Sequence, residues 1–85
     1  MSEVTQEELT QERELTYGEK AVGLKFNPGG SEQVNKVKAL YAEIIDLMNE
    51  VRGEERNERS RLCSVAITEA QAAQMWAVKA ITWKG

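Results

Sequence analysis

The segment from Asn57 to Gly85 constrains the fold more than any other part of the chain. Its alanines recur at steps of four, three, four and three residues, the average repeat of a packed helical seam; they are Ala66, Ala70, Ala73, Ala77 and Ala80. Alanine is the best helix former and lets a partner helix approach closely. Further apolar residues flank the seam, namely Leu62, Val65, Ile67, Met75, Trp76, Val78, Ile81 and Trp83. Because a chain of 85 residues supplies few neighbours, we expect part of this helix, predicted from about Asn57 to Trp83, to be buried against other copies of the chain.

A second amphipathic helix is predicted from Ser31 to Arg52. Ser31 is a natural N-cap, and the sizeable apolar residues follow three- and four-residue steps that place them on one face; they are Val34, Val37, Tyr41, Ile44, Met48 and Val51, with Leu40, Ile45 and Leu47 widening that face. The charged segment 53–57, which begins with Gly53, is typical of a turn. Two long helices joined by a short turn form an antiparallel hairpin.

A short helix is predicted upstream of the hairpin, over residues 17–22. Thr16 and Glu19 have the spacing of a capping box, and Gly23 can end the helix. Residues 1–15 are acidic and are predicted to be a tail, in which a short helix could form. No alternating strand pattern occurs, so we expect an all-α fold, with the tail at 1–15 and a helical-hairpin domain at 16–85.

Composition limits how such a small domain can be stabilised. A domain of this length buries only about 60% of its unfolded surface and commonly needs a metal, disulfides or oligomerisation. Cys63 is the only cysteine and the chain has no histidine, which argues against a disulfide, a structural zinc site or any other metal cofactor. Oligomerisation through the helices remains. We expect Cys63, which follows Leu62, to be buried and inert.

The formal net charge of −3 argues against binding to DNA or RNA. Residues 1–19 hold six Glu and one Arg and therefore carry −5, which leaves +2 for residues 20–85. A small anionic ligand is therefore compatible with the body of the chain. No apolar run approaches the roughly 18 residues of a membrane span. The lone cysteine and the lack of a recognisable signal peptide point to a reducing, cytoplasmic setting.

Catalysis is not expected from this inventory. Without histidine no Ser–His or Cys–His pair can form, and no phosphate-loop motif is present. The many carboxylates are expected to be solvated on helix surfaces. We therefore expect a protein that is not an enzyme.

The loop from Lys25 to Ser31 is the most suggestive candidate for a ligand site. Phe26 could stack on a base and Asn27 could bind its edge, while free amides at the start of the following helix favour an anion. Lys36 and Lys38 are within plausible reach of a phosphate. Alternatively, Phe26 plugs the hairpin core and Asn27 merely turns the chain.

Other candidates lie outside this loop. Tyr17 could be a stacking platform or a packing residue. Arg61, Ser64 and Thr68 share one helical face and could bind phosphate, or could form a solvent-facing stripe. Trp76 and Trp83 are seven residues apart, which favours core or subunit-interface packing.

Three segments resemble a family of phage proteins. They are Leu15–Leu24 running into Phe26-Asn27-Pro28, the pattern Val34-x-x-Val37-Lys38, and Met75–Ala80. Together they are similar to the small helical-hairpin domain of phage anti-CBASS proteins, which are sponges for cyclic oligonucleotide signals, and to a related sponge that counters Thoeris immunity.

The resemblance implies a protein that acts in the cytoplasm of the infected bacterial host. It would sequester cyclic dinucleotides without cleaving them, and some members of the family also hold cyclic trinucleotides in a separate pocket. It also implies a homo-oligomer, commonly a hexamer, with pockets between subunits. An aromatic residue would stack on a base, a role open to Phe26 or Tyr17, and a lysine would meet the phosphate, a role open to Lys36 or Lys38. The alternative is a non-catalytic, oligomeric helical hairpin that binds another protein.

Overall fold

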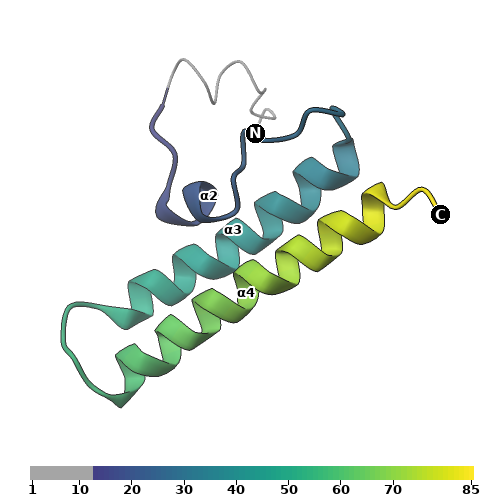
Figure 1. Ribbon diagram of the computed structural model, residues 1–85. Coiled ribbons are helices and arrows are strands. Elements are labelled where there is room, and N and C mark those ends of the chain that lie inside the picture. Colours follow the sequence, from purple (N-terminus) through teal and green to yellow (C-terminus); the bar gives the residue numbers. More distant parts are fainter. Residues whose placement is uncertain (1–12) are drawn as a thin grey trace.

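The computed structural model describes residues 13–85, which form three helices and no strand. Figure 1 shows α3 (Glu32–Arg52) and α4 (Glu58–Thr82) side by side and antiparallel, with α2 (Tyr17–Ala21) against α3. The all-α prediction and the helical hairpin are confirmed. Residues 1–12 of the predicted acidic tail lie outside the described residues, so the tail stays a prediction.

The helix ends follow local capping chemistry. At the start of α2 the Thr16 hydroxyl accepts a hydrogen bond from the Glu19 N–H at 3.1 Å, and the Glu19 carboxylate accepts one from the Thr16 N–H at 2.9 Å. This is the predicted capping box. The Ser31 hydroxyl accepts from the Val34 N–H at 3.2 Å, and Asn57 caps α4 in the same way. Each cap satisfies amides that the first helical turn leaves without partners.

Glycines supply the left-handed backbone that ends two of the helices. Gly23 follows α2 with φ of 63°, and Gly53 follows α3 with φ of 61°. Residues with a β-carbon rarely adopt this conformation. The chain therefore turns where the sequence predicts.

The segment from α2 to Leu24 lies across the hairpin and completes its core. Val22 and Leu24 from this segment pack with residues of both long helices; the latter are Ala42, Ile45 and Ile67. Two polar contacts hold α2 in place. The Gly18 N–H donates to Asp46 Oδ1 at 2.7 Å, and Gln71 Nε2 donates to the Ala21 carbonyl at 3.3 Å.

The predicted buried face of α3 is partly wrong. Ile44 and Val51 were assigned to it, but they are exposed, as are Leu40 and Leu47. The buried line instead steps through Val34, Lys38, Tyr41, Ile45, Met48 and Arg52, all buried or half-buried. The helix carries two apolar stripes, and its packing in the hairpin uses only one of them.

The alanine seam of α4 is not the face that packs inside the hairpin, and its burial against other copies stays a prediction. The buried residues of α4 are Cys63, Ile67 and Gln74, which confirms the burial of Cys63. The predicted alanines at 66, 70, 73 and 77 are only half-buried, and Ala80 is exposed. The seam inside the hairpin therefore uses larger side chains, and the alanines lie beside it.

Candidate functional site

Phe26 lies on the loop between α2 and α3, which runs from Gly23 to Ser31 (the Gly23–Ser31 loop). Its side chain is 73% exposed. The alternative in which Phe26 plugs the hairpin core is therefore wrong: Val22 and Leu24 fill that space instead. An exposed ring on this loop can stack against a planar group.

Lys38 lies directly beneath this loop. Its side chain is only 4% exposed, and its ammonium donates hydrogen bonds to the carbonyl of Gly23 at 3.0 Å and to the carbonyl of Phe26. The ammonium is also 5.5 Å from the centre of the Phe26 ring. Burial lowers the pKa of Lys38. The sequence brings Phe26 and Lys38 forward as candidates, and the structure places them together.

Asn27 is used within the loop. Its side-chain amide donates to the Ser31 carbonyl and to Asn35 Oδ1, both at 2.8 Å, and its Oδ1 accepts from the Ser31 N–H at 3.2 Å. These bonds engage both donor hydrogens and one acceptor site. The Gly30 N–H is likewise bonded, to the Asn27 carbonyl at 3.0 Å. The expectation of free amides is therefore wrong at Gly30 and Ser31, and the geometry gives Asn27 a loop-shaping role.

A second group of candidates meets at Arg52, which the sequence analysis missed. The Arg52 guanidinium carbon is 5.5 Å from the centre of the half-exposed Tyr17 ring. The guanidinium donates to the Ser64 hydroxyl at 3.1 Å and to Asn49 Oδ1. It thus joins α2, α3 and α4. The residue spacing could have pointed to Arg52. It lies on the same face of α3 as Ile45, at three- and four-residue steps along the helix.

The predicted polar face of α4, made of Arg61, Ser64 and Thr68, does not form an anion site within one chain. Arg61 is exposed and pairs with the Glu58 carboxylate at 2.7 Å, which lowers the pKa of Glu58. Arg61 and Ser64 line an open depression at the hairpin turn that does not include Thr68. Three arginines and three glutamates line it, so its charge does not favour an anion; they are Arg52, Arg56, Arg61, Glu54, Glu55 and Glu58.

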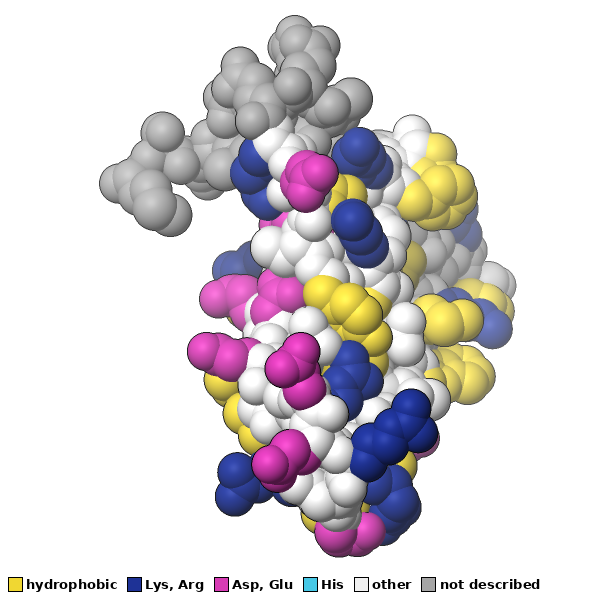
Figure 2. Space-filling view, turned by 90° about the vertical axis from the view of Figure 1, so that its left-hand side faces the viewer, with side chains coloured by type: hydrophobic (Ala, Val, Ile, Leu, Met, Phe, Trp, Pro, Cys, Tyr) yellow, Lys and Arg dark blue, Asp and Glu magenta, His cyan; other side chains and the backbone are white. Residues whose placement is uncertain are grey.

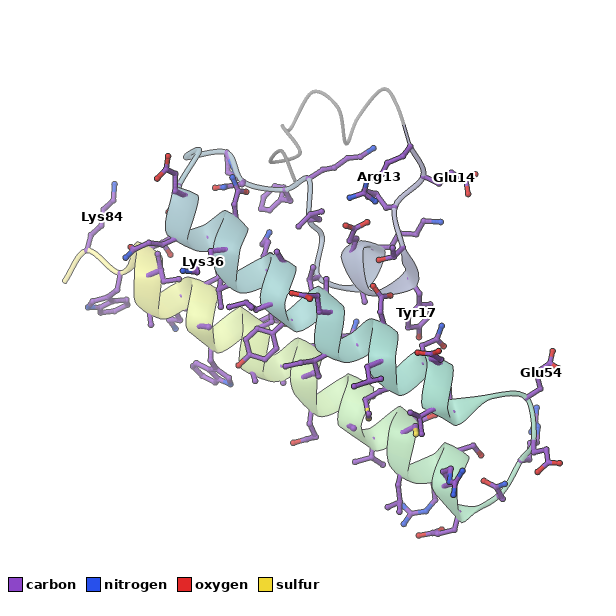
Figure 3. The ribbon with its side chains drawn as sticks, turned by 180° about the vertical axis from the view of Figure 1, so that it is seen from behind. Arg13, Glu14, Tyr17, Lys36, Glu54 and Lys84 are labelled. Carbon is purple, nitrogen blue, oxygen red and sulfur yellow. The ribbon has the colours of Figure 1, made fainter. Side chains whose placement is uncertain are left out.

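Lys36 and Tyr17 lie apart on the molecule. Figure 3 shows Lys36 near the start of α3, exposed, and Tyr17 further along that helix toward the hairpin turn. The eight candidate residues therefore do not converge on one pocket. Within one chain Phe26 and Lys38 form one pair, and Tyr17 and Ser64 are joined through Arg52, which was not a candidate. The other candidates lie outside these two groups.

Both long helices also expose apolar side chains to solvent. On α3 they form a stripe at four- and three-residue steps, made of Leu40, Ile44, Leu47 and Val51. On α4 they are Leu62, Val65, Met75 and Trp76, and Trp83 follows at the C-terminal cap of that helix. Of the two kinds of packing predicted for the tryptophans, core packing within one chain is wrong, since Trp76 is 69% and Trp83 is 67% exposed. Packing at a subunit interface stays a prediction.

Figure 2 shows apolar side chains along the right-hand edge of one face of the molecule, with Lys and Arg among them and most Asp and Glu toward the left. Lys79 lies beside the two exposed tryptophans, because its ammonium is 5.5 Å from the centre of the Trp76 ring and 5.9 Å from the centre of the Trp83 ring. Apolar patches of this kind mark interaction surfaces.

Residues 13–85 contain neither a cluster of metal-binding side chains nor a helix that could span a membrane. No three His, Cys, Asp or Glu side chains come together in a way that could hold a metal ion. No helix in this part of the chain is long and apolar enough to cross a bilayer.

Comparison with known proteins identifies the hairpin. A family model described as "Acb2/Tad1, hairpin domain" matches residues 19–82, which are 64 of the 85 residues. Of the segments that carry the resemblance found in the sequence, the match includes residues 19–24, Phe26-Asn27-Pro28, Val34–Lys38 and Met75–Ala80. Residues 15–18, and with them Tyr17, lie outside it. No curated protein and no solved structure gives a significant match.

Proposed function

Because the chain belongs to the Acb2/Tad1 hairpin-domain family, the family of anti-CBASS and anti-Thoeris sponges, we propose that it is a phage protein that sequesters cyclic oligonucleotide signals. Membership confirms the resemblance seen in the sequence and implies sponge-type binding of signalling molecules. The proposed ligands are cyclic dinucleotides, with cyclic trinucleotides as a further class. Their removal would block CBASS signalling in the infected cell.

The observation that carries this proposal is the exposure of Phe26 on a well-bonded loop inside the matched segment. A ring that is 73% exposed is open to a ligand, and covering it would contribute favourable free energy. A nucleobase is a suitable cover, because stacking on an aromatic side chain contributes about 1–3 kcal/mol per base. Lys36, exposed two residues before Lys38 on α3, is the candidate for contact with a phosphate.

Tight binding requires the ligand to be enclosed, and a single hairpin leaves Phe26 open. The exposed apolar stripes of α3 and α4 supply a reason for several copies to associate. We therefore place the pocket between copies of the chain in a homo-oligomer, with a hexamer as the form expected for the family. Enclosure would also strengthen phosphate contacts, because charge-assisted hydrogen bonds gain strength away from water.

We further propose that the ligand is held and released intact. The chain contains no histidine, so it lacks the most common general base and any histidine metal ligand. Sequestration needs neither of these. Tight binding is enough to sequester a ligand, and a nanomolar dissociation constant corresponds to a binding free energy of about −12 kcal/mol.

A second function is supported by the same apolar stripes. They could bind another protein, which would make the chain a helical interaction module with no nucleotide ligand. The exposed tryptophans with Lys79 between them favour this alternative, because Trp is enriched in protein interfaces.

Calorimetric titration separates the two functions. The purified protein is titrated with cyclic di-AMP, cyclic di-GMP, cyclic GMP–AMP and cyclic tri-AMP, and each bound ligand is released by heat and weighed by mass spectrometry. We expect tight binding of at least one ligand and its intact release. Phe26→Ala should weaken binding about tenfold to a hundredfold, whereas Glu43→Gln should not. No heat with any ligand would favour the interaction module, and a cleaved ligand would indicate an enzyme.

A further inference from the structure

The C-terminal part of α4 combines exposed aromatic rings with positive charge. Trp76 is 69% and Trp83 is 67% exposed, and the Lys79 ammonium lies 5.5 Å from the centre of the first ring and 5.9 Å from the centre of the second. Residues 70–85 contain Lys79 and Lys84 but no Asp or Glu. Neither lysine takes part in the two ion pairs found in the described part of the chain. We call Trp76, Lys79, Trp83 and Lys84 the tryptophan face.

The N-terminal segment of the same chain has the complementary composition. Residues 1–12, which lie outside the described residues, hold four Glu and no Lys or Arg, so their side chains carry −4. Thr5 and Glu8 have the spacing of a capping box, and Val4 and Leu9 occupy the two positions of a hydrophobic staple around it. This sequence predicts a helical turn that brings two apolar side chains together beside several carboxylates. A surface of that kind matches the rings and ammonium groups of the tryptophan face.

The length of the segment and its point of attachment also fit. The Arg13 guanidinium donates two hydrogen bonds of 2.7 Å to the Glu19 carboxylate, which ties the end of the segment to α2. Figure 3 shows Arg13 beside α2 and Lys84 past the end of α4. Twelve residues span up to about 40 Å when extended, whereas the whole of α4, with 25 residues, is about 37 Å long. Residues 1–12 are therefore long enough to reach the tryptophan face of their own chain.

Covalent attachment favours this segment over a separate acidic partner. A single exposed ion pair contributes little, so a free acidic peptide would bind the face weakly. A tethered segment is present at an effective concentration on the order of millimolar. Weak contacts are then sufficient to keep it in place.

We propose that residues 1–12 dock onto the tryptophan face of their own chain. Their carboxylates lie at Lys79 and Lys84, and Val4 and Leu9 pack against the two rings. The contact covers an apolar surface of the single chain until another copy or another protein displaces the segment. The acidic segment thus controls access to this face.

Tryptophan fluorescence tests the proposal on the full chain. The two tryptophans of the face are the only ones present, so quenching by acrylamide reports on this face alone. Neutralising the segment should raise the quenching constant about twofold, and 1 M salt should do the same to the wild type, because salt screens exposed charges. The variant combines Glu3→Gln, Glu7→Gln, Glu8→Gln and Glu12→Gln.

A matched control removes four exposed carboxylates from α3 and the hairpin turn. It should quench as the wild type does. The control combines Glu43→Gln, Glu50→Gln, Glu54→Gln and Glu55→Gln. Equal quenching of the wild type and of the variant with the neutralised segment would refute the proposal.

Carbodiimide cross-linking locates the contact, because it joins a carboxylate to an amine that it touches. Unlabelled and ¹⁵N-labelled protein are denatured, mixed, refolded together and cross-linked. Peptides that link residues 1–12 to Lys79 or Lys84 should carry a single isotope, as expected within one chain. Mixed-isotope peptides would assign the segment to a neighbouring copy, and links to other lysines alone would place it elsewhere. Either result would overturn the proposal.

Dilution distinguishes the segment from a subunit interface as the cover of the tryptophan face. A contact within one chain does not depend on protein concentration, so the quenching constant of the wild type should stay the same on dilution. A constant that rises as the solution mass falls would assign the face to an interface between copies and contradict the proposal. None of these measurements requires a cyclic nucleotide, so their outcome is independent of the proposed function.

Discussion

The N–H of Gly18 donates a hydrogen bond to Asp46 Oδ1 at 2.7 Å, across 28 positions of the sequence. This contact brings α2 so close to α3 that a β-carbon on Gly18 would overlap the main-chain carbonyl of Ala42. Main chain cannot move aside as a flexible side chain can. The contact between α2 and α3 at Gly18 therefore fixes the position of the following segment, which carries Val22, Leu24 and Phe26, on the hairpin.

Gly18→Ala should therefore destabilise the protein by about 1–3 kcal/mol, as overpacking of a close contact does. The variant should unfold at lower urea concentration at the same protein concentration. Gly29→Ala is the matched control, because a β-carbon on Gly29 meets no atom within 4 Å. Equal stability of Gly18→Ala and the wild type would show that α2 does not dock as described.

Asn27→Ala should destabilise the loop because it leaves the N–H and the carbonyl of the half-buried Ser31 without their partner. The expected cost is about 1–3 kcal/mol in chemical unfolding, the range for unsatisfied polar groups. Gln33→Ala, an exposed change in the first part of α3, should stay within about 0.5 kcal/mol of the wild type. If Asn27→Ala weakened ligand binding while stability stayed unchanged, Asn27 would be a direct ligand contact instead.

Stability should fall at acid pH through Glu19. The side chain of Arg13 hydrogen-bonds the Glu19 carboxylate at 2.7 Å and lowers its pKa, and the Thr16 N–H acts in the same direction. A carboxylate whose folded-state pKa is lowered stabilises the fold above its unfolded pKa of about 4.3. This contribution is lost as pH falls through the lowered folded-state pKa.

Glu19→Gln isolates that effect, because glutamine can still accept the capping-box bond from Thr16. The wild type should exceed the variant by about 0.5–1 kcal/mol at pH 6, since the pair is partly exposed to solvent. The difference should shrink toward zero as the pH approaches 3, and it should be smaller at pH 6 in 1 M salt. A difference that is independent of pH would exclude the ion pair as its cause.

Self-association should depend on the outer stripe of α3. Leu47 is 54% exposed in the single hairpin, so Leu47→Glu should lower the solution mass measured by light scattering without reducing helix content. Ala39→Glu places the same charge on an exposed position off that stripe and should leave the mass unchanged. A wild-type mass equal to that of one chain would contradict both the assembly and a pocket between copies.

Features that depend on a few neighbouring residues were predictable from the sequence. Thr16 with Glu19, Ser31, Gly23 and Gly53 mark helix ends, because a cap or a turn involves atoms only three or four residues apart. The repeat of apolar residues likewise predicts two long helices, and a short turn makes them antiparallel. The hairpin segments also carried the family resemblance.

The sequence by itself thus determined the helices, their caps and their order. Only the tertiary structure decided which stripe of each helix faces inward. A helix with two apolar stripes can turn either one to its partner, and the choice follows from packing with the segment from α2 to Leu24. That choice buries Lys38 beneath Phe26 and exposes the ring, because Val22 and Leu24 already fill the core. It also brings Arg52 to Tyr17 and Ser64, which lie far apart in the chain.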